Sequence, residues 1–210
     1  MDAQICTIYE DEDLVALNKP AGAIFDWALE RRPELFLVHR LDKDTSGIIL
    51  FAKNARTQEY LKRLFQKHEI KKTYLALVVG EVKRKEGTID LAIGRSRKTP
   101  LKRVSIGARR GKLREAVTRY KILKRFEGLT LVEAYPKTGR THQIRSHFAA
   151  IGHPVVCDKL YAGKKFICPG GLTRQFLHAA ALELTLPSGG RLRLEADLPA
   201  DLAAALRQAK

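Results

Sequence analysis

The chain has 210 residues, 45% of them hydrophobic and 30% charged, which is the balance of a globular protein rather than a disordered one. Its 39 Lys and Arg outnumber its 23 Asp and Glu, and the formal net charge of +16 favours nucleic acid over a small molecule as the partner. The longest unbroken apolar run, residues 74–79, is far shorter than the roughly 20 residues of a membrane-spanning helix, so we expect no membrane association.

The N-terminal residues and the cysteines narrow the class further. Residues 10–13 are acidic where a secretory signal would be basic and then apolar. Cys6, Cys157 and Cys168 are odd in number and widely spaced, so the sequence predicts neither a disulfide framework nor a zinc knuckle. We therefore expect a soluble, cytoplasmic protein with one domain over residues 1–210.

Alternating apolar patterns and turn residues predict mainly strands in the first third of the chain. The expected elements are strands at residues 4–9 and 13–18, one or two helical turns at 26–32, a buried strand at 35–39, a turn at 41–47 and a strand at 47–53. Asn54 is a good N-cap for a helix that ends at about residue 68.

Strands also dominate the rest of the chain. The expected elements are strands at 71–80 and 88–91, a hairpin of 117–126 and 129–135 around Glu127-Gly128, a helix at 141–151 closed by Gly152, a hairpin of 177–186 and 191–196, and a helix at 199–209. Because hairpins join most of the strands, we expect an α+β protein with a mixed, largely antiparallel central sheet and flanking helices.

Residues 94–114 hold nine Lys or Arg in 21 positions and no acid. We interpret this segment as an exposed basic loop or hairpin. A solvated charge run is the plainer interpretation, but nine cations without one acid favour contact with phosphates. Neither a phosphate-binding loop nor a dinucleotide fingerprint occurs in the chain, so no nucleotide cofactor is expected.

Asp42 follows a buried strand and enters a polar loop, a common place for functional residues. A carboxylate beside Arg40 can remain ionised for covalent or base chemistry. From these residues alone, an aspartate that binds its own turn is the better interpretation. His39 is better explained as a strand-end histidine with satisfied hydrogen bonds than as a catalyst.

Two further residues have both a plain and a functional interpretation. Tyr74 begins the strongest strand, where a tyrosine is usually part of the core but can also stack on a base. Arg140 precedes a helix, where it can project into a cleft or belong to a solvated face. His142 and His147 are five residues apart and do not share a helix face, so no metal site is expected.

Taken together, these segments resemble the RluA family of RNA pseudouridine synthases, over roughly residues 5–197 and in the family's order. The most specific match is His39-Arg40-Leu41-Asp42-Lys43-Asp44-Thr45-Ser46-Gly47. The other matching segments are Tyr9-Glu10-Asp11, Asn18-Lys19-Pro20-Ala21-Gly22, Lys71-Lys72-Thr73-Tyr74-Leu75-Ala76, Gly139-Arg140-Thr141-His142-Gln143-Ile144-Arg145, Gly152-His153-Pro154 and Leu177-His178-Ala179.

The resemblance implies the pseudouridine synthase fold with a catalytic cleft, and isomerisation of particular uridines in structured RNA without cofactor or metal. It implies that Asp42 is the essential carboxylate, that Arg140 is its ion-pair partner, and that Tyr74 lies against the target base and assists removal of the C5 proton. It also implies that Arg40 fills the gap left by the flipped uridine.

We expect RNA contacts from Arg40, His39 and Arg145, and from the basic segment at Arg109, Arg110 and Lys112. Two features depart from many relatives: only 16 residues separate Gly22 from His39, and no N-terminal S4-type RNA-binding module is expected. Target choice is then expected to come from the domain itself, with the basic segment as the specificity element. A monomer is expected.

Large-subunit ribosomal RNA is the first choice of substrate and transfer RNA the second. The main alternative from another class is a non-catalytic protein that binds or folds RNA on the same scaffold, which would have no reason to retain Asp42, Tyr74 and Arg140 together. A glycosidase-like hydrolase needs two carboxylates flanking one bond, and Asp44 is better explained as part of the turn.

Overall fold

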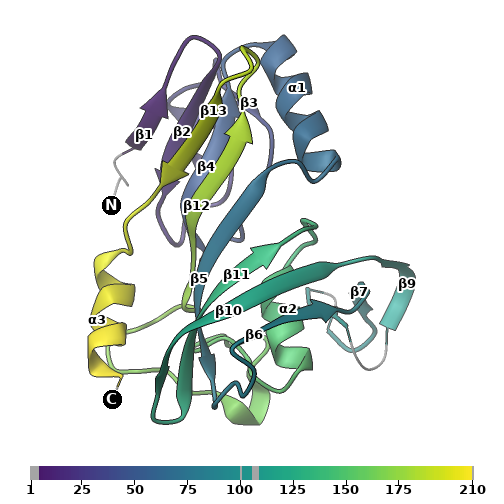
Figure 1. Cartoon of the computed structure of the whole chain (residues 1–210), viewed down its shortest axis with the longest axis vertical. Helices are drawn as coiled ribbons and strands as arrows, with labels where there is room; N and C mark the ends of the chain where they lie inside the picture. Colours follow the sequence, from purple (N-terminus) through teal and green to yellow (C-terminus); the bar gives the residue numbers. More distant parts are fainter. Residues whose placement is uncertain (1–4, 100, 106–108, 210) are drawn as a thin grey trace. The chain divides into compact units, whose positions relative to one another are not determined.

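The computed structural model describes residues 5–99, 101–105 and 109–209. The chain divides into two compact units (Figure 1). The first comprises the residues up to Lys72 together with His178–Asp197, and the second comprises Thr73–Leu177 and the residues from Leu198 onward. Strands β5 (Lys71–Val79) and β12 (Leu177–Thr185) have residues in both units.

The first unit is a sheet with one long helix. Its strands follow the order β1 (Cys6–Glu10), β2 (Leu14–Lys19), β4 (Ser46–Ala52) and β12, with β13 (Arg191–Glu195) on β12 and β3 (Phe36–Leu37) on β4. β1 with β2, β2 with β4, β3 with β4 and β12 with β13 pair antiparallel, whereas β4 pairs with β12 in parallel.

Helix α1 (Ala55–Gln66) places Leu61 and Leu64 in the core of this unit. The predicted N-cap is confirmed, because the side-chain oxygen of Asn54 accepts the Thr57 N–H at 2.8 Å.

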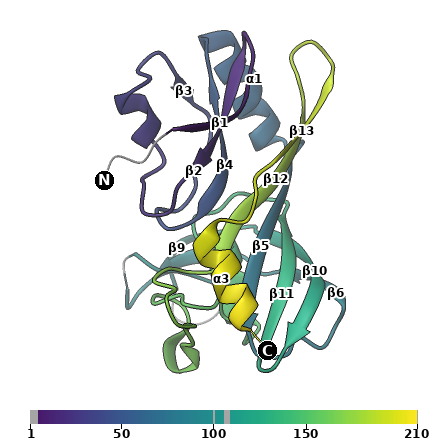
Figure 2. The same ribbon diagram turned by 90° about the vertical axis from the view of Figure 1, so that its left-hand side faces the viewer.

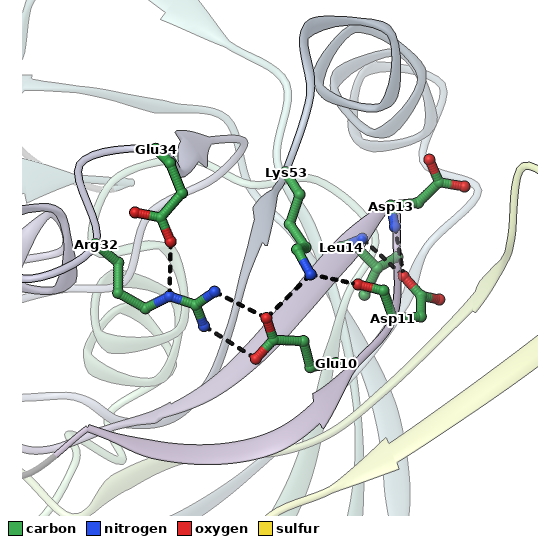
Figure 3. A network of polar contacts seen from close by, with 7 residues as sticks. All are labelled: Glu10, Asp11, Asp13, Leu14, Arg32, Glu34 and Lys53. Carbon is green, nitrogen blue, oxygen red and sulfur yellow. Dashed lines mark hydrogen bonds and ion pairs between the residues drawn. The ribbon is translucent and has the colours of Figure 1, made fainter.

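A polar network ties three distant parts of the first unit together (Figure 3). Arg32 follows the 3₁₀ helix η1 (Trp27–Glu30), and its guanidinium donates to both carboxylate oxygens of Glu10, at 3.0 and 2.8 Å. It also donates to Glu34 at 2.9 Å. Lys53, just after β4, lies 3.1 Å from the Glu10 carboxylate and donates to the Asp11 carbonyl at 2.7 Å. The network therefore fixes the segment before β3 against the end of β1.

The second unit is built on an antiparallel sheet in the order β5, β11 (Leu129–Pro136), β10 (Val117–Phe126) and β6 (Glu86–Asp90). The hairpin predicted around Glu127-Gly128 is confirmed as β10–β11. Helices α2 (Gln143–Ala150) and α3 (Ala200–Gln208) pack on the sheet, and α3 is seen in front of β5 in Figure 2. Phe148 of α2 and Leu202 of α3 lie in one core with Val78.

The segment expected to be a basic loop or hairpin forms a second, smaller sheet. It has the order β8 (Arg103–Val104), β7 (Ile93–Ser96) and β9 (Arg109–Arg114), and we call residues 93–114 the basic sheet. Arg95 of β7 pairs with Arg103 on one side and with Arg110 on the other. Of the two interpretations, loop or hairpin, the structure therefore agrees with the hairpin, because β7 pairs antiparallel with both flanking strands.

The cysteine prediction also needs correction. Cys157 and Cys168 form a disulfide, with their Cα atoms 4.4 Å apart, although the sequence predicted none. A hydrogen bond from the Cys157 N–H to the Ile167 carbonyl, at 2.8 Å, folds the intervening segment back on itself, together with the 3₁₀ helix η2 (Gly163–Lys165). The spacing of the two cysteines along the chain did not show that their side chains come together.

The α+β class with a largely antiparallel sheet and flanking helices is confirmed. Within the part of the chain that the structure describes, no helix has the length and apolar character needed to cross a membrane. The single domain over residues 1–210 stays a prediction.

Candidate functional site

Asp42 lies in the loop between β3 and β4, in the first unit. Leu41 beside it is only 4% exposed and anchors the loop in the core, whereas Asp42 itself is half-buried. The Asp42 carbonyl accepts the Thr45 N–H at 3.1 Å, which closes the turn predicted for residues 41–47. The backbone beneath the carboxylate is therefore fixed.

A buried lysine forms hydrogen bonds to the backbone of the same loop. Lys19 is 0% exposed, and its ammonium donates to the carbonyls of Pro20, Ala23 and Lys43 at 2.8, 2.7 and 2.8 Å. The Lys43 carbonyl also accepts the Gly22 N–H at 3.0 Å. The segment after β2 is thus bonded to the residue that follows Asp42.

The far end of the loop is held by His178 of β12. Its Nδ1 lies 2.9 Å from the Ser46 hydroxyl and its Nε2 lies 3.1 Å from the Ala196 carbonyl. Because a carbonyl can only accept, Nε2 carries the proton and Nδ1 accepts from Ser46. Next to this bond, a Cβ on Gly47 would come within 2.2 Å of the Ala179 carbonyl oxygen, so only glycine fits.

His39 has a structural environment. Its Nε2 accepts the Leu50 N–H at 2.9 Å, and its ring stacks on Phe65 with the centroids 4.5 Å apart. Burial, and then the charge of Lys72, lowers the pKa of His39 to about 3. The ring is therefore neutral at physiological pH, as its acceptor role requires. Its predicted contact with RNA stays a prediction.

Arg40 is exposed, in contrast to the two residues that flank it. Its guanidinium carbon lies 4.9 Å from the centroid of the Phe25 ring, which is a cation–π arrangement. The contact orients the guanidinium while leaving it accessible to solvent and to a ligand.

Tyr74 lies on β5 in the second unit, opposite Ala134 of β11. The ring is half-buried and packs at the edge of the core that contains Val78. Two residues earlier, in the first unit, burial lowers the pKa of Lys72 to about 8. Tyr74 thus fits both the core and the base-contact interpretations.

Arg140 precedes α2 in a turn that Gln143 holds against β10. The Gln143 side-chain oxygen accepts the Arg140 N–H at 3.0 Å and the Thr138 hydroxyl at 2.7 Å, and its amide nitrogen donates to the Val117 carbonyl at 3.1 Å. The Arg140 Nε donates to the Glu115 carbonyl at 3.0 Å. Both the backbone and the guanidinium of Arg140 are therefore oriented by the second unit itself.

Arg145, expected to contact RNA, is 7% exposed and points inward. It forms a two-pronged ion pair with the fully buried Asp158, with Nε 2.7 Å from one carboxylate oxygen and Nη2 3.0 Å from the other. The guanidinium also lies 5.1 Å from the centroid of the Tyr161 ring. Sequence reasoning singled out neither Asp158 nor Tyr161. The predicted RNA contact of Arg145 stays a prediction.

The three cations predicted to bind phosphate all lie on β9 of the basic sheet. Lys112 is exposed. The backbones of Arg109 and Arg110 pair with β7, while their side chains lie outside what the structure describes. Among residues 5–99, 101–105 and 109–209, no group of three or more His, Cys, Asp or Glu side chains is arranged to hold a metal ion.

Comparison with known proteins identifies the class. The profile of the RNA pseudouridylate synthase family matches residues 13–150. The solved structure of human RNA pseudouridylate synthase domain containing 1 superposes with a TM-score of 0.82 at 27% identity, covering 96% of this chain and 87% of that one. The chain belongs to the RNA pseudouridylate synthase family, and the predicted fold is confirmed.

Curated relatives confirm the resemblance to the RluA family. Ribosomal large subunit pseudouridine synthase D of Nitrosomonas europaea is 38% identical over 95% of this chain and 64% of its own length. Ribosomal large subunit pseudouridine synthase C of Vibrio vulnificus is 39% identical over 89% of this chain and 63% of its own length. The chain thus spans slightly less than two thirds of these relatives.

Proposed function

We propose that this protein is an RNA pseudouridine synthase that converts specific uridines in structured RNA to pseudouridine. The observation that carries the proposal is the loop of residues 39–47, which has the family's motif and holds Asp42 on a backbone fixed by Thr45 and Lys19. Large-subunit ribosomal RNA is the first candidate substrate because the relatives named above are ribosomal large subunit enzymes. Transfer RNA is the second candidate.

The reaction breaks the bond between N1 of uracil and C1′ of ribose and forms a bond between C5 and C1′. A proton leaves C5 and one is gained at N1, so no atom is lost and no oxidant is needed. The base has to leave the helical stack, because its C5 edge must turn toward the sugar. Asp42 supplies the essential carboxylate, by attack on the sugar or by abstraction of a proton from it.

The other roles follow from the family motif. Arg140 is the ion-pair partner of Asp42, and its planar fork suits a carboxylate better than an ammonium does. Tyr74 lies against the uracil and assists removal of the C5 proton. Arg40 fills the space that the flipped uridine leaves in the RNA, and its exposure and its contact with Phe25 support that role.

Asp42→Asn tests the chemistry, because it keeps the size of the side chain and removes its charge. We expect folding and RNA affinity to persist while pseudouridine formation by the purified protein disappears. Asp44→Asn is the matched control: it removes the same charge two residues away in the same turn, and we expect it to leave the rate within about threefold. Substantial pseudouridine formation by folded Asp42→Asn protein contradicts the assignment.

The substrate is tested by mapping pseudouridine across total RNA from cells with and without the gene. A site that disappears from large-subunit ribosomal RNA supports the first candidate, and one that disappears from transfer RNA supports the second. No change in any RNA, together with RNA binding by the purified protein, supports a non-catalytic RNA-binding protein instead.

A further inference from the structure

Tyr161 connects the basic sheet to the turn that carries Arg140. Its hydroxyl oxygen accepts the backbone N–H of Arg103, on β8, at 2.8 Å, and lies 3.0 Å from Nδ1 of His142. We propose that Tyr161 is a positioning residue that couples RNA bound on the basic sheet to the placement of Arg140. This inference rests on the proposed function.

The tyrosine is fixed from the side of helix α2. One oxygen of Asp158 accepts the N–H groups of Leu160 and Tyr161 at 3.0 and 3.1 Å, while the carboxylate pairs with Arg145 of α2. The Tyr161 side chain is buried, and the Arg145 guanidinium lies near its ring. A buried ion pair with this many hydrogen bonds holds its members in one arrangement. Tyr161 is therefore held in one position by its surroundings.

Residues of the basic sheet contact Tyr161 directly. Besides the Arg103 N–H, the ammonium of Lys102 lies 5.0 Å from the centroid of the Tyr161 ring. A second link runs directly to α2, because the hydroxyls of Ser105 and Ser146 lie 3.1 Å apart. A shift of the basic sheet when RNA binds would therefore act on Tyr161 through the hydrogen bond from the Arg103 backbone.

The other partner of the hydroxyl leads to Arg140. His142 comes two residues after Arg140 and is the N-cap of α2, with a left-handed backbone (φ 56) that is uncommon for a residue other than glycine. Its ring also makes an edge-on contact with the Tyr161 ring, with the centroids 5.7 Å apart. Because the hydroxyl oxygen already accepts from Arg103, its own proton can be donated to His142. One hydroxyl therefore bonds both the basic sheet and the Arg140 turn.

Tyr161→Phe removes this hydroxyl and keeps the ring, the cations and the Asp158 pair. We expect the dissociation constant for the RNA substrate to stay within about twofold, because no phosphate-binding charge is lost. We expect the single-turnover rate at saturating RNA to fall about tenfold, because Arg140 is no longer placed with the bound RNA. The Arg103 amide should exchange its hydrogen faster, which hydrogen–deuterium exchange of the peptide around it measures without any RNA.

Tyr60→Phe is the control. It removes a tyrosine hydroxyl that donates to backbone carbonyls, at 3.1 and 3.3 Å, in the first unit, and it should change neither the rate nor the exchange of the basic sheet. An unchanged single-turnover rate in Tyr161→Phe overturns the inference, and so does a loss of affinity without a loss of rate. A lower melting temperature with a full rate below it also overturns it, since that is a purely structural effect. If the wild-type protein forms no pseudouridine, the proposed function fails, while the exchange measurement still tests the link itself.

Discussion

Lys19 shows how backbone carbonyls can bind the N–H groups of a buried ammonium. Its ammonium has three N–H groups, and three backbone carbonyls accept them within 2.8 Å. Burial of an ammonium is costly unless its hydrogen bonds are made. Moving the loop would break these bonds, so they also hold the loop in place. The sequence motif identified the residue, but only the structure shows that its partners include the neighbour of Asp42.

Lys19→Met keeps much of the length of the side chain and removes its donors. We expect the free energy of unfolding to fall by about 2 to 5 kcal/mol, because the half-buried carbonyls of Pro20 and Ala23 lose the hydrogen bonds that they accept from Lys19. Urea unfolding measures the change. Lys43→Met, on the exposed lysine of the same loop, is the control and should change stability by less than about 0.5 kcal/mol. Equal stability of the two variants contradicts this account.

At the scale of elements, local signals predicted best where both partners are neighbours in the chain. Glu127-Gly128 predicted the β10–β11 hairpin, and Asn54 predicted the start of α1. The strand expected at residues 35–39 is reduced to β3, and the basic segment forms three strands, because in both cases the pairing with another strand decides which residues are ordered as strand. The helix expected from 141 begins at Gln143 because His142 has a left-handed backbone.

The Glu10 network makes the first unit sensitive to acid. Hydrogen bonds from Arg32, and then from Lys53, lower the pKa of Glu10 from 4.5 to about 2 despite the opposing effect of burial. A lowered pKa in the folded state stabilises the protein above about pH 4.5, and this stabilisation is lost as the pH falls toward about 2.

We therefore expect Glu10→Gln to be less stable than wild type at pH 7 and to lose less stability between pH 5 and pH 2. Thermal unfolding across that range measures the difference, which 1 M salt should reduce because the pair is partly exposed. Glu12→Gln, on an exposed carboxylate of the next turn, is the control and should follow the wild-type profile. Parallel profiles for Glu10→Gln and wild type refute the assignment.

The basic sheet makes a separate prediction about RNA affinity. If Arg109, Arg110 and Lys112 neutralise phosphates, each contributes about 0.7 to 0.9 to the slope of log affinity against log salt. Replacing all three by Gln should flatten the slope by about 2 to 3 and weaken binding, while saturating RNA restores most of the turnover rate. A salt titration of RNA binding measures the slope.

The matched control replaces Lys62, Arg63 and Lys67 by Gln, which removes three exposed cations at α1 in the first unit. It changes the net charge by the same amount and should leave the slope nearly unchanged. Equal slopes for the two triple variants show that net charge, rather than local phosphate contact, governs affinity.

At the scale of the whole molecule, the sequence predicted the class and its main motifs better than the contacts that support them. The motif at 39–47 identified the family because nine adjacent residues carry the signal, and the role of Asp42 within it stays a prediction. Tyr161 had no such signal, since its bonds reach Arg103, which lies 58 residues away, and a buried Asp158–Arg145 pair separated by 13 residues. Contacts of this kind depend on packing, which a single sequence does not display.

The parallel pairing of β4 with β12 has a consequence for synthesis on the ribosome. Ser46 and Gly47 pair with His178 and Ala179, so the first unit needs residues made after the 105 residues of 73–177. At about 5 to 20 residues per second, translation of that stretch takes roughly 5 to 20 s. During this time the nascent chain carries the Asp42 loop without the strand and the histidine that hold its far end. The Asp42 loop therefore gains its last contacts only after residues 178 and 179 have been made.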